Sequence, residues 1–128
     1  MAEIERVMLG DEVVAVTISG ELDMADESRA DLTIDFVIGL EAHGALLDLT
    51  RCGYIDMSGL RLLLRASERL LRAGIPVAVA GPAPPGMRRV LDLTGVSSEL
   101  AMFDDREQAI AALMSRAATV RLGVQAAG

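Results

Sequence analysis

The sequence has almost none of the residues from which reactive or cross-linked sites are built. Its 128 residues include one cysteine, one histidine, one tyrosine and no tryptophan. The single thiol, Cys52, cannot form a disulfide within the chain, which predicts a reducing, cytoplasmic setting. Cys52 and His43 together are too few ligands for a structural zinc site, so we expect no metal.

Motifs for enzymatic chemistry are also missing. No glycine pattern matches a phosphate-binding P-loop or a dinucleotide-binding turn, so no cofactor is expected. Ser58 lies in Asp-Met-Ser-Gly and not in the Gly-x-Ser-x-Gly elbow of hydrolases, and the only histidine would have to serve as its base. These absences argue against an enzyme; an enzyme with Ser58 as nucleophile is the weakest of the functions considered.

Basic residues are few and of one kind. There is no lysine, and 12 arginines stand against 19 acidic residues, for a net charge of −7. This charge disfavours nucleic acid and anionic membranes as partners and favours a basic surface on another protein. No segment resembles a signal peptide, and no apolar run approaches the roughly 20 residues of a membrane helix. We therefore expect a protein that acts through another protein.

Short aliphatic runs dominate what the sequence does contain. Valine and isoleucine alternate with smaller or polar residues after a three-residue turn at 10–12, which predicts an antiparallel hairpin. Later apolar runs are bounded by glycine, proline or polar residues, as buried strands are. The expected strands are residues 4–9, 13–19, 45–49, 75–80 and 100–103.

Between these strands, apolar residues recur with the helical period. The first helix should begin after a cap at Asp26 or Ser28 and end near His43, with Gly44 as its terminator. Its buried side is expected to include Leu32, Phe36, Val37 and Leu40. The other expected helices are residues 60–73, closed by Gly74, residues 87–93, and a last helix from a cap at Asp104 or Asp105 to about Ser115.

Alternation of strands and helices after a hairpin predicts an α/β fold. We expect one small domain with a mixed central sheet of about four to five strands and about four helices. The domain should span residues 1–116. Residues 117–128 show no clear periodicity and are expected to form a loose tail.

The turn between residues 54 and 60 is the most informative stretch. Asp56, Met57 and Ser58 lie where a predicted strand meets a predicted helix. A hydroxyl at or beside a helix N-cap faces unpaired backbone N–H groups, and the helix dipole would tolerate a phosphate on Ser58. The alternatives are that Ser58 is only a cap, or that Asp56 caps the helix in its place.

The same helix carries a row of basic residues. Arg61, Arg65 and Arg69 are four residues apart, and Arg72 lies on the same polar side with Glu68. Such a row could bind an acidic partner or a nucleotide phosphate. The alternative is a solvated face that nearby acidic residues neutralise.

Several short motifs occur together in a recognisable order. Asp-Met-Ser-Gly-Leu at residues 56–60 stands among Gly-Glu-Leu-Asp at 20–23, Gly-Ile-Pro-Val at 74–77 and Leu-Asp-Leu-Thr-Gly at 91–95. Over residues 4–115 the sequence resembles a STAS domain of the bacterial anti-sigma factor antagonist type. Met57 is a departure, because many members have serine or threonine there.

The resemblance implies a protein that exchanges partners. The unmodified antagonist binds an anti-sigma factor, which has an ATP-binding fold and often acts as a serine kinase, and a sigma factor is released. Phosphorylation of the antagonist ends the complex, and a metal-dependent Ser/Thr phosphatase restores it. On this chain the implied phosphate acceptor is Ser58. The expected partner-binding residues are Asp23, Asp56, Met57, Ser58, Gly59 and Arg61, with Gly59 allowing close approach of the other chain.

A second function remains open. Some STAS domains are never phosphorylated, and this one could be a scaffold subunit of a transporter ATPase or of a sensory complex. Ser58 would then only cap its helix.

Overall fold

The structure is a computed structural model that describes residues 1–10, 12–81, 93 and 101–121, with side chains described as far as residue 116. It contains one five-stranded mixed sheet in the order β1-β2-β3-β4-β5. The first two strands form the predicted antiparallel hairpin, and all later pairs are parallel. The strands are β1 (Ala2–Leu9), β2 (Val13–Leu22), β3 (Gly44–Ile55), β4 (Val77–Ala80) and β5 (Ala101–Phe103).

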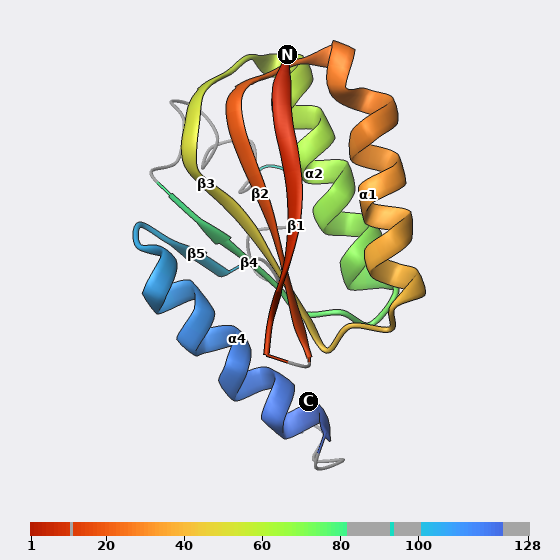
Figure 1. The fold of residues 1–128 in the computed structure, drawn as a ribbon, viewed down its shortest axis with the longest axis vertical. Helices are drawn as coiled ribbons and strands as arrows, with labels where there is room; N and C mark the ends of the chain where they lie inside the picture. The colour runs from red at the N-terminus through yellow and green to blue at the C-terminus, as the bar shows by residue number, and fades with distance from the viewer. Residues whose placement is uncertain (11, 82–92, 94–100, 122–128) are drawn as a thin grey trace.

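Helices cover both faces of this sheet (Figure 1). On one face, α1 (Glu27–Gly39) follows a short 3-10 helix, η1 (Met24–Asp26), and lies beside α2 (Met57–Arg72). On the other face lies α4 (Arg106–Arg121). This confirms the predicted small α/β domain; the helix predicted at residues 87–93 falls almost entirely outside the described residues.

The alternation along β2 explains the two cores. Val14 and Val16 point into a large cluster beneath α1 and α2, whereas Val13 and Ala15 point into a smaller cluster beneath α4. Successive side chains of a strand point to opposite faces, so a strand buried on both sides must be apolar at every position. The burial of the first four residues of β2 between two helical layers therefore follows from their composition, whereas Gly20 and Glu21 near its end are exposed.

Gly74 ends α2 as predicted. Its φ is +79°, in the left-handed region that favours glycine. The N–H of Gly74 donates to the carbonyl of Leu71, and that of Ile75 to the carbonyl of Leu70, both at 3.0 Å. These two bonds form a Schellman motif, which satisfies carbonyls that the helix leaves unpaired.

The end of α1 differs from the prediction. The helix ends at Gly39 and not near His43, and Gly44 is already the first residue of β3. The backbone N–H of His43 donates to the carbonyl of Glu12 at 2.8 Å. Since this bond aligns the chain beside the start of β2, the helix has to end before it, and Gly44 does not act as its terminator.

The buried face of α1 was also predicted wrongly in part. Val37 is buried, as expected, together with Ile34, but Leu32 is 68% exposed and Phe36 48%. Leu40, just past the helix, is exposed as well. The Arg6 guanidinium of edge strand β1 lies 3.7 Å from the centre of the Phe36 ring, so a cation–π contact takes the place of burial.

Five elements, β1, β2, β3, α2 and α4, are longer than predicted, and β4 is shorter because it begins at Val77. β3 continues to Ile55 because its second half pairs with the end of β2, and α2 then begins at Met57. α4 continues to Arg121 and crosses the predicted domain end at residue 116. Its start agrees with the prediction, since the Asp105 carboxylate accepts from the N–H groups of Glu107 and Gln108, at 2.6 and 3.2 Å.

Candidate functional site

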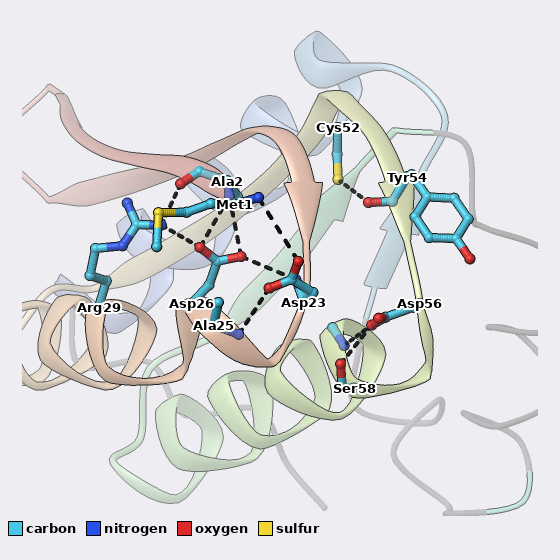
Figure 2. Close-up of polar contacts among 11 residues, drawn as sticks. Met1, Ala2, Asp23, Ala25, Asp26, Arg29, Cys52, Tyr54, Asp56 and Ser58 are labelled. Atoms are coloured by element: carbon cyan, nitrogen blue, oxygen red, sulfur yellow. Dashed lines mark hydrogen bonds and ion pairs between the residues drawn. The ribbon is translucent and has the colours of Figure 1, made fainter.

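The candidate site lies at the carboxyl ends of β2 and β3. Leu22 pairs with Ile55 at the last position of this parallel pair, and each strand leads directly into a helix. Asp23 therefore begins η1 and Asp56 begins α2 at the same edge of the sheet (Figure 2). This edge is where open α/β sheets usually carry their binding residues.

Asp56, and not Ser58, is the N-cap of α2. Its backbone is extended, with φ −87° and ψ −176°, and its carboxylate accepts from the N–H of Gly59 at 2.8 Å. Its carbonyl accepts from the N–H of Leu60 at 2.9 Å. Ser58 is thus the second residue of the helix, and of the two predicted caps the structure has Asp56.

The Ser58 hydroxyl is oriented by this cap. Ser58 is half-buried, and its Oγ donates to Oδ1 of Asp56 at 2.7 Å (Figure 2). Hydrogen bonds from the Gly59 N–H and the Ser58 hydroxyl lower the pKa of Asp56, because they favour its charged form. At neutral pH an ionised carboxylate therefore holds the hydroxyl at the start of α2.

Gly59 has a role within the chain. It is buried, and a Cβ at this position would lie 2.1 Å from the carbonyl oxygen of Leu22. No side chain fits at such a distance, so the first turn of α2 can pack against the end of β2 only with glycine here. The close approach that the structure shows at Gly59 is to β2 of its own chain, and its expected role toward a second chain stays a prediction.

Asp23 caps the other helical turn at this edge. Its carboxylate accepts from the N–H of Ala25 at 2.9 Å, and its own N–H donates to Asp26 at 3.1 Å, which forms a capping box. The described residues show no hydrogen bond between Asp23 and either Asp56 or Ser58. The structure thus joins Asp56 to Ser58 directly and brings Asp23 only to the same edge.

Asp26, predicted only as a possible cap of the first helix, is a buried hydrogen-bonding centre. It is fully buried, and its two carboxylate oxygens accept from the N–H of Ala2 at 3.0 and 3.2 Å while Arg29 pairs with one of them. Burial raises the pKa of Asp26, but hydrogen bonds from Asp23 and Ala2 and the Arg29 charge outweigh it, so the pKa is lowered. Only a helix cap could be inferred from sequence, because β1 is distant along the chain.

Large apolar side chains are exposed near this edge. Met24 is 64% exposed, Tyr54 61% and Met57 60%. Met57, one of the expected partner-binding residues, is therefore exposed, and so are Met24 and Tyr54. Exposed apolar side chains gathered beside polar groups are typical of protein interaction surfaces. Here Tyr54 and Met57 flank Asp56 in the sequence, and Met24 follows Asp23 at the same edge of the sheet.

Comparison with protein families decides the family of this fold. The family model described as "STAS domain" matches residues 6–109, most of the chain. This protein belongs to the STAS domain family. Comparison of the sequence with curated proteins gave no match.

Solved structures share the STAS fold at low sequence identity. An anti-sigma factor antagonist from Mycobacterium paratuberculosis is 22% identical, with a TM-score of 0.72 over 89% of this chain and 95% of its own. The phosphorylated Bacillus cell fate determinant SpoIIAA is 23% identical, with a TM-score of 0.68 over 87% and 99%. A sulfate transporter family protein from Wolinella succinogenes is 22% identical, with a TM-score of 0.69 over 88% and 93%.

Most of the arginine row on α2 of this STAS domain is neutralised by α1. Arg65 pairs with Glu27 at 3.3 Å and with Asp31 at 3.0 Å, and Arg69 pairs with Asp31 and Asp35. Arg72 pairs with Glu68 within α2. The solvated, neutralised face is therefore the correct interpretation for these three residues. Arg61 is exposed and forms no ion pair with the residues that the structure describes.

The described part of the STAS domain shows neither a metal site nor a reactive thiol. No group of three or more His, Cys, Asp or Glu side chains there could hold a metal ion. Burial raises the pKa of the Cys52 thiol, whose sulfur lies 3.5 Å from the Tyr54 carbonyl oxygen, so it is protonated at neutral pH. Within the described residues no helix is both long and apolar enough to span a membrane.

Proposed function

We propose that this STAS domain is an anti-sigma factor antagonist. In its unphosphorylated state it binds an anti-sigma factor that has an ATP-binding fold and acts as a serine kinase. Binding releases a sigma factor, phosphorylation of Ser58 ends the complex, and a Ser/Thr phosphatase restores it. The observation that carries the proposal is the Ser58 hydroxyl held 2.7 Å from Asp56 at the start of α2. The anti-sigma factor antagonist from Mycobacterium paratuberculosis shares the fold.

Phosphorylation would change this turn electrostatically. The added group carries a charge of roughly −1.5 to −2 at neutral pH and replaces the hydroxyl hydrogen that Ser58 donates. Asp56, whose lowered pKa keeps it ionised, would then face a second negative group. A partner that packs on Ser58 and Met57 would meet both the repulsion and the desolvation cost of a phosphate. A loss of about 3 kcal/mol would weaken binding roughly 150-fold, which is enough to exchange partners.

The test begins with the partner. The tagged protein is used to capture proteins from cell extract with ADP or ATP, and the captured kinase is identified by mass spectrometry and purified. We expect Ser58→Ala to bind it as tightly as the wild type and to escape phosphorylation. Ser58→Asp should bind about 100-fold more weakly, because it introduces a negative charge at the docked turn.

Ser28 supplies the matched control, because it is exposed and is the second residue of α1 just as Ser58 is the second residue of α2. Ser28→Ala and Ser28→Asp should leave binding and phosphorylation unchanged. Equal binding by Ser58→Ala and Ser58→Asp, or a phosphate placed elsewhere on the chain, would contradict the proposal.

The likeness to a sulfate transporter family protein favours one alternative, a STAS scaffold that is not phosphorylated. The same capture experiment separates the two functions. Recovery of a transporter subunit with unmodified Ser58, and without any kinase, would favour the scaffold. Ser58 would then serve only to complete the Asp56 cap.

A further inference from the structure

Arg61 differs from every other arginine of α2. Arg65, Arg69 and Arg72 each pair with a carboxylate, whereas Arg61 is exposed and forms no ion pair with the residues that the structure describes. The planar guanidinium of arginine carries five N–H donors whose geometry matches a carboxylate or a phosphate. The position of Arg61 near the start of α2 indicates which group it meets.

Arg61 lies one helical turn beyond Ser58. Residues three apart on a helix are surface neighbours, and a charged pair at this spacing attracts. Both residues belong to α2, so their spacing does not depend on any other element. The long arginine side chain can therefore reach a group attached to the Ser58 oxygen.

The start of α2 alone offers a phosphate little compensation. Asp56 already accepts the N–H of Gly59 with its carboxylate and the N–H of Leu60 with its carbonyl. Its carboxylate also lies 2.7 Å from the Ser58 oxygen and would repel a phosphate there. A positive side chain would offset this repulsion, and Arg61 stands at the helical spacing that suits it.

We propose that Arg61 binds a phosphate carried by Ser58 within the same chain. The inference rests on the proposed phosphorylation of Ser58 and deepens it. In the unmodified protein Arg61 stays exposed one turn from Met57, where it can meet a carboxylate of the partner. In the modified protein the guanidinium turns to the phosphate. Modification therefore adds a negative charge and withdraws a positive one from the same surface.

The test uses protein with phosphoserine encoded genetically at position 58, so that no kinase is required. The second ionisation of the phosphate is followed by ³¹P NMR as a function of pH in the wild type, in Arg61→Gln and in Arg72→Gln. Arg72→Gln is the matched control, because it makes the same change at the far end of α2, where Arg72 pairs with Glu68.

We expect the second pKa of the phosphate to be lower in the wild type and in Arg72→Gln than in Arg61→Gln, because a nearby positive charge favours the dianion. The difference should shrink in 1 M salt, which screens exposed pairs. The Arg61 side-chain N–H signal should also shift when Ser58 is phosphorylated.

Equal phosphate pKa values in the wild type and in Arg61→Gln would overturn the inference. The outcome is separate from that of the proposed function. If the captured kinase does not modify Ser58, the proposed function is wrong, but the NMR result is unaffected. If the phosphate pKa does not depend on Arg61, the role proposed for Arg61 is wrong, but the kinase result is unaffected.

Discussion

At the scale of single residues, the carboxylates of Asp56 and Asp26 have different roles at the same edge of the sheet. Asp56 caps α2 and orients the Ser58 hydroxyl at the surface. Asp26 is buried and ties the first strand to the first helical turn through the N–H of Ala2 and the Arg29 side chain. A buried carboxylate is tolerated only when it is fully hydrogen-bonded and paired, so the stability of this corner depends on Asp26.

Asp26→Asn should lower the free energy of unfolding by about 2 to 3 kcal/mol at pH 7, because it removes a charge that several donors share. The lowered pKa fixes the pH dependence. The contribution of Asp26 is fully present above the ordinary aspartate pKa of about 3.9 and is lost as pH falls through the lower pKa of the folded state.

Urea unfolding at pH 7 and at pH 3 measures the free energy of unfolding. The difference in this free energy between the wild type and Asp26→Asn should be smaller at pH 3. Asp35→Asn is the control, since Asp35 is exposed in its pair with Arg69 and should cost no more than about 0.5 kcal/mol. A gap that widens in acid would show that Asp26 does not act through its charge.

At the scale of elements, one contact sets how α2 meets the sheet. The first turn of α2 lies against the last residue of β2, where Gly59 faces the carbonyl of Leu22. This contact places the Asp56–Ser58 turn of β3 and α2 beside Asp23 and η1. The geometry of the candidate site therefore depends on two strands and two helical turns, and not on the motif alone.

Gly59→Ala should destabilise the fold by about 1 to 3 kcal/mol, because its methyl group would overlap the Leu22 carbonyl and force α2 away from β2. Thermal unfolding measures the loss. Gly39→Ala is the control: Gly39 is also helical, nothing lies within 4 Å of its added Cβ, and stability should be unchanged or slightly raised. Equal melting temperatures for the two variants would show that α2 can move away from β2 without a loss of stability.

At the scale of the whole molecule, the sheet separates two cores of unequal size. The larger lies beneath α1 and α2, and the smaller one joins α4 to the sheet through Ala109 and Leu113. The candidate site belongs to the first layer, and α4 lies on the opposite face (Figure 1). Stability and partner binding should therefore be separable through substitutions in α4.

Leu113→Ala should cost about 2 to 4 kcal/mol, because Leu113 is only 1% exposed and its loss leaves a cavity beneath α4. Urea unfolding measures this cost. Binding of the captured partner, measured at a temperature where the variant is folded, should stay unchanged. Arg116→Ala, an exposed change on the same helix, should alter stability by less than about 0.5 kcal/mol. Weaker binding by folded Leu113→Ala would show that α4 influences the Ser58 face.

Features that depend on neighbouring residues could be predicted from the amino-acid sequence. Strand alternation, the hairpin, the Gly74 terminator and the strand-to-helix turn at Ser58 were all predicted correctly. Each follows from local backbone preferences or from side-chain periodicity, which a single stretch of chain specifies. The family resemblance rested on the same short motifs, and it was confirmed over residues 6–109.

Which helix face is buried, which arginines are paired and where glycine is required depend instead on how the elements pack together. Leu32 and Phe36 fit a buried helical face by pattern, yet α1 buries Ile34 and Val37 because the sheet and α2 lie on that side. Carboxylates of α1 neutralise Arg65 and Arg69, and the end of β2 requires Gly59. These outcomes depend on residues far apart in sequence, whose proximity is created only when the sheet and its helices pack together.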